Sequence, residues 1–263
     1  MISFTSAQLD LWLATFMYPM ARILALLATA PIFNNAGLSA QIRLVIGLAI
    51  CFAVAPVLPA MPAVSPGSWQ GIAVLAQQII IGSVLGFTLR VVFTAVDVAG
   101  ELIGLQMGLS FASFFDPQSS AQSAVIGAFL GLLSTLLFLA MNGHLLMLSV
   151  LAESFTLLPI STTPFAAQGF AALLAWSATL FSAGLMLALP LIAAVLIANI
   201  SLGVLARIAP QLNIFAIGFP ITMIVGFVVL MLSLPHFGAA MERLYDRGFV
   251  ALSGVLRAGG ALS

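Results

Sequence analysis

The chain has 263 residues, of which 63% are hydrophobic and only 5% charged, and its seven arginines balance seven acids without any lysine. Ordinary soluble domains carry about a quarter charged residues, so this composition excludes a soluble globular enzyme and favours a protein of a bilayer or of a tightly packed membrane complex. The balanced charge gives no basic surface for nucleic acid. The lack of lysine excludes a Walker-type nucleotide site.

The first predicted helix covers Leu11–Phe33. It is long enough to cross a bilayer, because a spanning helix needs about 20 apolar residues. Only Asp10 precedes it, whereas a cleaved secretory signal begins with basic residues, so we interpret it as a retained helix. Arg22 stands alone near the middle of this helix and needs a partner from outside the chain, which favours an oligomer.

The second and third predicted helices differ in length. Leu44–Leu58 is short for a full crossing and ends in a proline-rich loop. The third begins near Trp69, runs uncharged to Leu89 and continues through more polar sequence. Gly82 and Gly86 lie within it at a spacing that lets two helices approach closely. The single cysteine, Cys51, is interpreted as a small core residue.

Three charged residues follow in the extension of the third helix. Arg90, Asp97 and Glu101 are seven and four residues apart, which places them along one helical face. One interpretation is a proton or ion relay in a wet path. The other is a cluster that pairs between helices or docks a neighbouring subunit, which the presence of both signs favours. Arg22 is grouped with these three as an intramembrane charge.

The stretch Gly100–Gln122 combines three glycines with an apolar cluster. The members of the cluster are Met107, Phe111, Phe114 and Phe115. Asp116 precedes Pro117, which disfavours helix at the residue before it, so a break is expected there. Aromatic and methionine side chains at such a break can plug a pore. An ordinary helix end with its aromatics in the core explains the same pattern equally well.

Three further helices are predicted in the second half. They cover Ala124–Leu151, Phe170–Leu205 with Pro190 inside, and Ile214–Leu234 with Pro220 inside. The chain is therefore expected to be an all-α integral membrane protein with about six long hydrophobic segments, arranged as kinked hairpins. The positive-inside rule gives conflicting sides for the arginines if all six cross regularly, so at least one segment is not a simple crossing.

The tail Phe237–Ser263 differs in character from the preceding segments. Apolar or small residues recur at helical spacing: Met241, Leu244, Tyr245, Gly248, Leu252 and Val255. Charged residues fall on another face: Glu242, Arg243, Asp246 and Arg247. This pattern predicts an amphipathic helix at an interface or against a partner, with Arg243, Tyr245 and Arg247 facing that partner. The alternative is a solvated helix packed on the rest of the chain.

Catalytic motifs are nearly absent. His144 and His236 are far apart, and neither has a metal-like spacing with Asp, Glu or Cys. No Gly-x-Ser-x-Gly occurs. We therefore expect no catalytic residues, no metal and no cofactor.

The run from Gly104 to Pro117 closely resembles the signature of the FliR family, the flagellar biosynthetic proteins of the type III export apparatus. Further matches follow in order and span essentially the whole chain. They are Arg22-Ile-Leu-Ala-Leu with Ala30-Pro-Ile, Asn142-Gly-His-Leu, Leu187-Ala-Leu-Pro190 and Ala209-Pro-Gln-Leu-Asn-Ile-Phe-Ala-Ile-Gly-Phe-Pro220. Injectisome relatives share Ala-Pro-Gln-Leu-Asn, so the flagellar assignment depends on the surrounding residues.

The resemblance implies a subunit that completes a helical protein-export gate with FliP and FliQ in the bacterial inner membrane, at the flagellar basal body. It implies a FliP-like part over about residues 1–165 and a FliQ-like hairpin with the C-terminal helix over about 166–263. A loop near residues 107–120 would act as a plug that closes the channel to unfolded flagellar export substrates at rest. The C-terminal helix would approach FlhB.

A small-solute transporter or channel is the alternative from a different class. It predicts internal inverted repeats with helix breaks at the midplane. Pro190 and Pro220 could serve as such breaks, but the two halves of the sequence show no convincing repeat. A membrane scaffold without a conduit is a third, weaker possibility.

Overall fold

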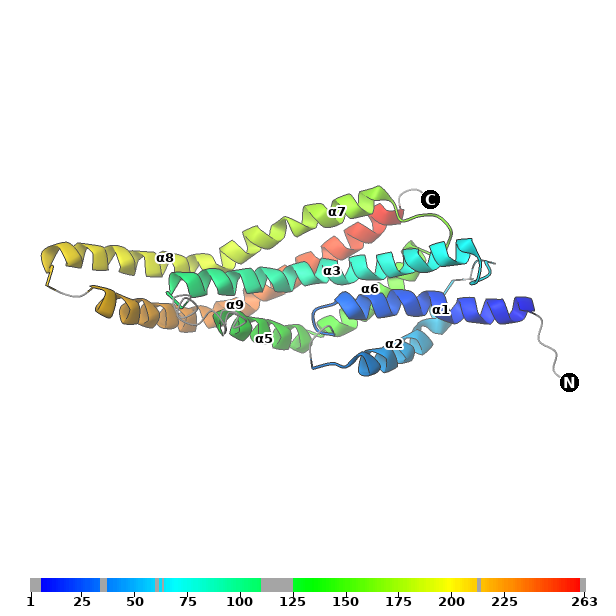
Figure 1. Cartoon of the computed structure of the whole chain (residues 1–263), viewed down its shortest axis with the longest axis horizontal. Coiled ribbons are helices and arrows are strands. Elements are labelled where there is room, and N and C mark those ends of the chain that lie inside the picture. Colours follow the sequence, from blue (N-terminus) through cyan, green and yellow to red (C-terminus); the bar gives the residue numbers. More distant parts are fainter. Residues whose placement is uncertain are drawn as a thin grey trace. The chain divides into compact units, whose positions relative to one another are not determined.

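The computed structural model describes residues 6–33, 37–59, 62, 64–109, 125–211 and 214–260. Helices make up nearly all of them, and these residues contain no strand, which confirms the all-α prediction (Figure 1). In chain order the elements are α1 (Ser6–Thr29), α2 (Ala40–Val54), the 3₁₀ helix η1 (Ala55–Val57), α3 (Trp69–Gln106), α5 (Val125–Ala140), α6 (Gly143–Leu157), α7 (Ala167–Ser177), α8 (Thr179–Ile208) and α9 (Ile214–Gly260).

The number of spanning helices is smaller than the six predicted. Within the described residues, four helical segments are long and apolar enough to cross a membrane: Asp10–Thr29, Trp69–Gln106, Ala167–Ile208 and Ile217–Gly260. The pair α5 and α6 makes a fifth if its two bent parts form one span. Helix α2 has only 15 residues, too few for the roughly 20 that a crossing needs.

Two predicted boundaries are wrong for local reasons. The span expected over Ala124–Leu151 is broken, because α5 ends at Ala140 and Asn142 adopts a left-handed backbone (φ 57°) before α6 begins. Asparagine tolerates this conformation better than most residues. The tail expected to start at Phe237 is instead continuous with the preceding segment, since α9 runs through Pro235 without ending. Proline removes one backbone donor, but here it does not stop the helix.

The described chain divides into two compact units. The first is made of residues 1–91, 142–177 and 247–263, and the second of residues 92–141 and 178–246. Both units therefore draw on both halves of the sequence. The division into FliP-like and FliQ-like parts near residue 165 does not follow these boundaries and stays a prediction.

In the first unit, α1 packs closely against the first part of α3. A Cβ atom at Gly82 would collide with the carbonyl oxygen of Arg22 and would lie 2.8 Å from the Cβ of Ala25. A Cβ at Gly86 would collide with the Oγ1 of Thr29. The close approach predicted from these two glycines is confirmed. The buried core around this contact includes Tyr18, Ile23, Leu26, Ile81, Leu85 and Leu151.

In the second unit, glycines likewise allow close packing where α3 meets α5. A Cβ at Gly100 would lie 2.6 Å from the backbone nitrogen of Gly127. On α8, a Cβ at Gly184 would lie 2.8 Å from the carbonyl oxygen of Ala95 on α3. Small residues thus let the helices of each unit approach closely enough for their backbones to touch.

Candidate functional site

Arg22 of α1 is completely buried in the first unit. Its Nε donates to the Oε1 of Gln78 at 2.8 Å. Its Nη1 donates to the carbonyl oxygen and the Oγ of Ser154, at 2.8 and 3.1 Å, and its Nη2 donates to the carbonyl oxygen of Leu158 at 2.8 Å. The guanidinium also lies over the ring of Phe155, 4.2 Å from its centroid. This geometry holds three helices, α1, α3 and α6, around one cation.

The position of these acceptors explains how the charge is tolerated. Ser154 and Leu158 lie at the C-terminal end of α6, where the helix dipole is negative, and the carbonyl oxygen of Ser154 also accepts from the backbone N–H of Leu158 at 2.9 Å. A cation there is stabilised without a carboxylate. The expectation that Arg22 needs a partner from outside the chain is therefore wrong. Sequence reasoning missed Gln78 and Ser154, since 56 and 132 residues separate them from Arg22.

The three charges of α3 are all exposed. Arg90 lies at the end of the α3 part that belongs to the first unit, and Asp97 and Glu101 lie in the second unit. An ideal Cβ at Gly131 of α5 would be 3.6 Å from Oδ1 of Asp97, which places this carboxylate beside α5. Exposed charges in a helix that can cross a membrane need a polar or charged environment outside the helix. Such residues are suited to contacts with another subunit.

The predicted plug falls mostly outside the described residues. The residues outside the described part are Phe111, Phe114, Phe115, Asp116 and Pro117. Met107 is described, and it is fully buried in the second unit. A Cβ at Gly226 of α9 would lie 2.7 Å from the sulfur of Met107, so the methionine fills the space that this glycine leaves. Met107 therefore packs within the chain; the plug itself stays a prediction.

The C-terminal part of α9 is amphipathic, as the sequence predicted. Its apolar positions, Met241, Leu244, Tyr245, Gly248, Leu252 and Val255, are all buried. Arg243 and Arg247 are exposed, as a partner-facing role requires.

Tyr245 does not belong with these arginines, and its assignment as partner-facing is wrong. It is only 3% exposed, and its hydroxyl donates to the carbonyl oxygen of Ser134 on α5 at 2.6 Å. Its ring packs against Phe93 and Phe138, with centroid distances of 5.8 and 5.2 Å. A tyrosine on the apolar face of a helix buries its ring and still satisfies its hydroxyl, so helical spacing alone could not exclude it from the partner face.

No three side chains of His, Cys, Asp or Glu gather to hold a metal ion in the part of the chain that the structure describes. The most prominent surface feature is apolar instead. Only 22% of the most hydrophobic window of Ala167–Ile208, and 11% of that of Ile217–Gly260, is buried within the chain. Surfaces of this kind are covered by lipid or by neighbouring subunits.

Comparison with known proteins gives consistent results over nearly the whole chain. The family described as "Bacterial export proteins, family 1" matches residues 13–248. The chain is 44% identical over 256 residues to the flagellar biosynthetic protein FliR of Pectobacterium carotovorum, with 97% of this chain and 98% of the relative covered. It is 43% identical over 256 residues to FliR of Escherichia coli, again with 97% of this chain and 98% of the relative covered. FliR of Aquifex aeolicus is 32% identical over 90% of this chain and 92% of its own length.

Proposed function

The chain belongs to the FliR family of bacterial export proteins, and on that premise we propose that it forms, with FliP and FliQ homologues, the gate through which unfolded flagellar proteins are exported. The chain is a membrane protein with several helices that can span a bilayer. We place it in the inner membrane at the flagellar basal body. The relatives compared above carry flagellar names, which favours this assignment over an injectisome homologue.

The observation that carries the proposal is the apolar and charged surface that the chain leaves uncovered. The hydrophobic windows of α8 and α9 are mostly exposed, and Glu101 is exposed on α3. Lipid can cover the apolar surface, but it does not stabilise an exposed carboxylate at membrane depth. Polar groups from neighbouring subunits can do so.

Co-purification tests the assembly. The tagged chain is extracted from flagellated cells in mild detergent, and the retained proteins are identified and their ratio is measured. We expect FliP and FliQ homologues to be retained, with the FlhB homologue associated more weakly. A chain that emerges alone, stable and able to bind a small solute as a monomer or symmetric oligomer would instead identify a transporter.

The plug is the finer part of the proposal. In the assembled gate, the segment near residues 107–120 closes the channel at rest. Deleting Ser110–Ser120 is expected to raise ion leakage through the complex, and replacing Phe111, Phe114 and Phe115 together by alanine is expected to do the same with assembly intact. Unchanged leakage would remove the plug role. Loss of assembly in the alanine variant would show that these aromatics are core residues.

A further inference from the structure

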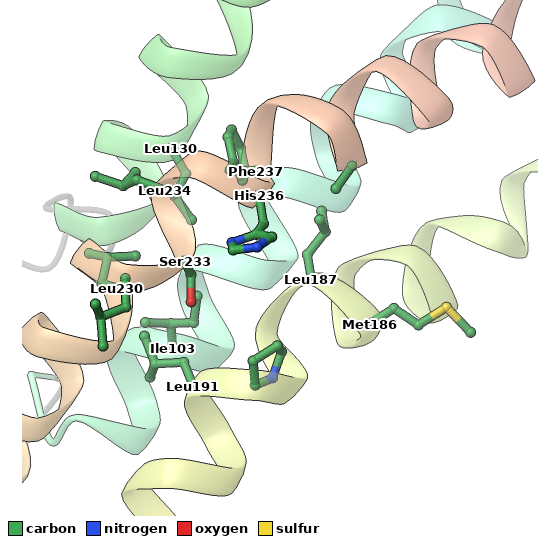
Figure 2. A pocket seen from close by; sticks show the side chains of 13 residues that line it. Ile103, Leu130, Met186, Leu187, Leu191, Leu230, Ser233, Leu234, His236 and Phe237 are labelled. Carbon is green, nitrogen blue, oxygen red and sulfur yellow. The ribbon is translucent and has the colours of Figure 1, made fainter.

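A cavity of about 400 Å³ lies within the second unit, among α3, α5, α8 and α9 (Figure 2). Its walls include Ile103 of α3, Leu130 of α5, Leu187 and Leu191 of α8, and Leu234 of α9. The volume falls within the range of about 300–1,000 Å³ that is typical of ligand pockets. The cavity is thus large enough for a ligand and is distinct from the charged residues of α3 discussed above.

The lining defines the chemistry of the occupant. The lining contains no Asp, Glu, Lys or Arg, and its two polar side chains are His236 and Ser233. The Ser233 hydroxyl already donates to the carbonyl oxygen of Val229 at 2.8 Å. A charged ligand would lose its hydration here without gaining a counter-charge. The occupant must therefore be apolar over most of its surface.

The mouth of the cavity opens on apolar surface. Met186 of α8 lines the cavity and is 72% exposed. Leu189, about one turn further along α8, and the lining residue Leu232 of α9 are also exposed. Helices α8 and α9 both belong to segments that can span a membrane. A molecule already dissolved in the hydrocarbon can enter such a cavity without crossing water.

We propose that this pocket binds an acyl chain of a membrane lipid. Pro190 lines the pocket, and Pro235 directly precedes His236 in α9. Proline inside a helix removes a backbone hydrogen bond, and both prolines lie at or next to residues that line the hollow between α8 and α9. A flexible acyl chain adapts to a hollow of this kind. A partner helix buries a continuous face, and one of its side chains would fill only part of the volume.

His236 supplies a polar contact for the same lipid. Its side chain is exposed at the pocket, and it has no hydrogen-bond partner among the residues that the structure describes. Figure 2 shows its imidazole between the α9 ribbon and Leu187. An imidazole N–H in this position can donate to the ester carbonyl oxygen at the head of the acyl chain. The binding site therefore combines an apolar cavity with one donor.

Photo-cross-linking in vesicles tests the assignment. The complex, purified with the subunits that it retains, is reconstituted into phosphatidylethanolamine vesicles that contain a phosphatidylethanolamine with a diazirine in its acyl chain. After irradiation, cross-linked positions are mapped by peptide mass spectrometry. We expect cross-links to concentrate on the pocket residues Leu187, Leu191 and Leu234. The exposed apolar residue Met231 on α9, which does not line the pocket, gives the background.

A matched pair of variants measures the contribution of the cavity. Ala240 lines the pocket, whereas the adjacent Ala239 is exposed and does not. Filling the cavity with Ala240→Leu is expected to reduce pocket cross-linking about tenfold, because overpacking excludes the chain. Ala239→Leu should leave it unchanged. Ser233→Leu fills the same cavity from another position and replaces Ala240→Leu if that variant does not assemble.

Three results would overturn the proposal. Cross-links on the pocket residues no more frequent than on Met231 would mean that lipid only coats the surface. Equal cross-linking in Ala240→Leu and Ala239→Leu would mean that the cavity is not the binding site. Pocket residues inaccessible to the lipid probe in the wild-type complex would mean that a partner subunit fills the hollow.

Discussion

The Nη1 of Arg22 on α1 donates to the carbonyl oxygen of Ser154 at 2.8 Å, so this cation caps the C-terminal end of α6. Replacing it with leucine, which is shorter and apolar, removes the donor to the Oε1 of Gln78 and to the carbonyl oxygen of Leu158, whereas the carbonyl oxygen of Ser154 keeps the backbone N–H of Leu158. We expect Arg22→Leu to lower the free energy of unfolding by about 2–6 kcal/mol, since each of these two unsatisfied buried acceptors costs ~1–3 kcal/mol. Thermal unfolding of the detergent-purified complex measures this.

The matched control for this prediction is Arg207→Leu, because Arg207 is exposed at the end of α8. It should change the stability little. Arg22→Lys retains the charge but lacks the planar fork that reaches several acceptors at once, so it should be intermediate. If Arg22→Leu is as stable as Arg207→Leu, the cap on α6 does not contribute to folding.

A second prediction concerns the contact between α1 and α3. Gly82→Ala is expected to force the two helices apart, because the added Cβ collides with the backbone at Arg22. The variant should accumulate poorly and unfold at a lower temperature than the wild type. Gly203→Ala on α8 is the control, since a Cβ there meets nothing within 4 Å and alanine favours helix by about 0.5–1 kcal/mol. Equal behaviour of the two variants would contradict the close packing.

Variants of Tyr245 distinguish a role in the core of the chain from a role in contacting a partner subunit. We expect Tyr245→Phe to cost about 1 kcal/mol through the lost hydrogen bond to Ser134, and Tyr245→Ala to cost about 3–5 kcal/mol through the cavity that it leaves. Both are measured as unfolding free energies in detergent. Val250→Ala, at an exposed position of the same helix, serves as the reference. Normal stability with loss of a retained subunit would restore the partner-facing interpretation.

The charges of α3 provide a fourth test. If they pair with other helices or subunits, Arg90→Glu should reduce the amount of FliP and FliQ homologues that co-purify, and Asp97→Asn should have a mild effect. Reversing a charge places like charges together, whereas Asp97→Asn removes a charge but retains hydrogen bonding. Subunit ratios and export are measured on the same cells. Normal assembly with lost export in Asp97→Asn would instead revive a proton relay.

A fifth prediction uses the single cysteine as a probe of α2. Cys51 is 1% exposed, and its thiol lies 4.0 Å from the carbonyl oxygen of Phe16 on α1. A maleimide should therefore react with the folded chain at least about tenfold more slowly than with the denatured chain, since reactivity requires access. Mass spectrometry over a time course measures the labelling. Equal rates would show that α2 does not pack against α1 as described.

The helical character of this chain was predictable because it depends on local composition. Long apolar runs need every backbone group bonded within the segment, and helices achieve this without distant partners. The C-terminal amphipathic face was also predictable, since helical spacing identified all of the residues that are buried there, from Met241 to Val255. The resemblance to the FliR family likewise depended on residues close together in the sequence.

Features that depend on a single residue's backbone were harder to predict. The bend at Asn142 was missed although Asn142-Gly143 is a dipeptide typical of turns, because it lies inside a long apolar run and no proline marks it. The helix through Pro235 was missed for the opposite reason, since proline usually ends a helix but surrounding packing can sustain one. The number of spans depends on both features.

The sequence by itself determined that the chain is helical, apolar and a member of an export-protein family, because composition and short motifs carry that information. Only the tertiary structure decided which polar groups meet. Arg22 finds Gln78 and the end of α6 across separations that no local pattern encodes, and Tyr245 finds Ser134 in the same way. Burial makes these pairings necessary, since a polar group removed from water must bond to whatever the fold brings near.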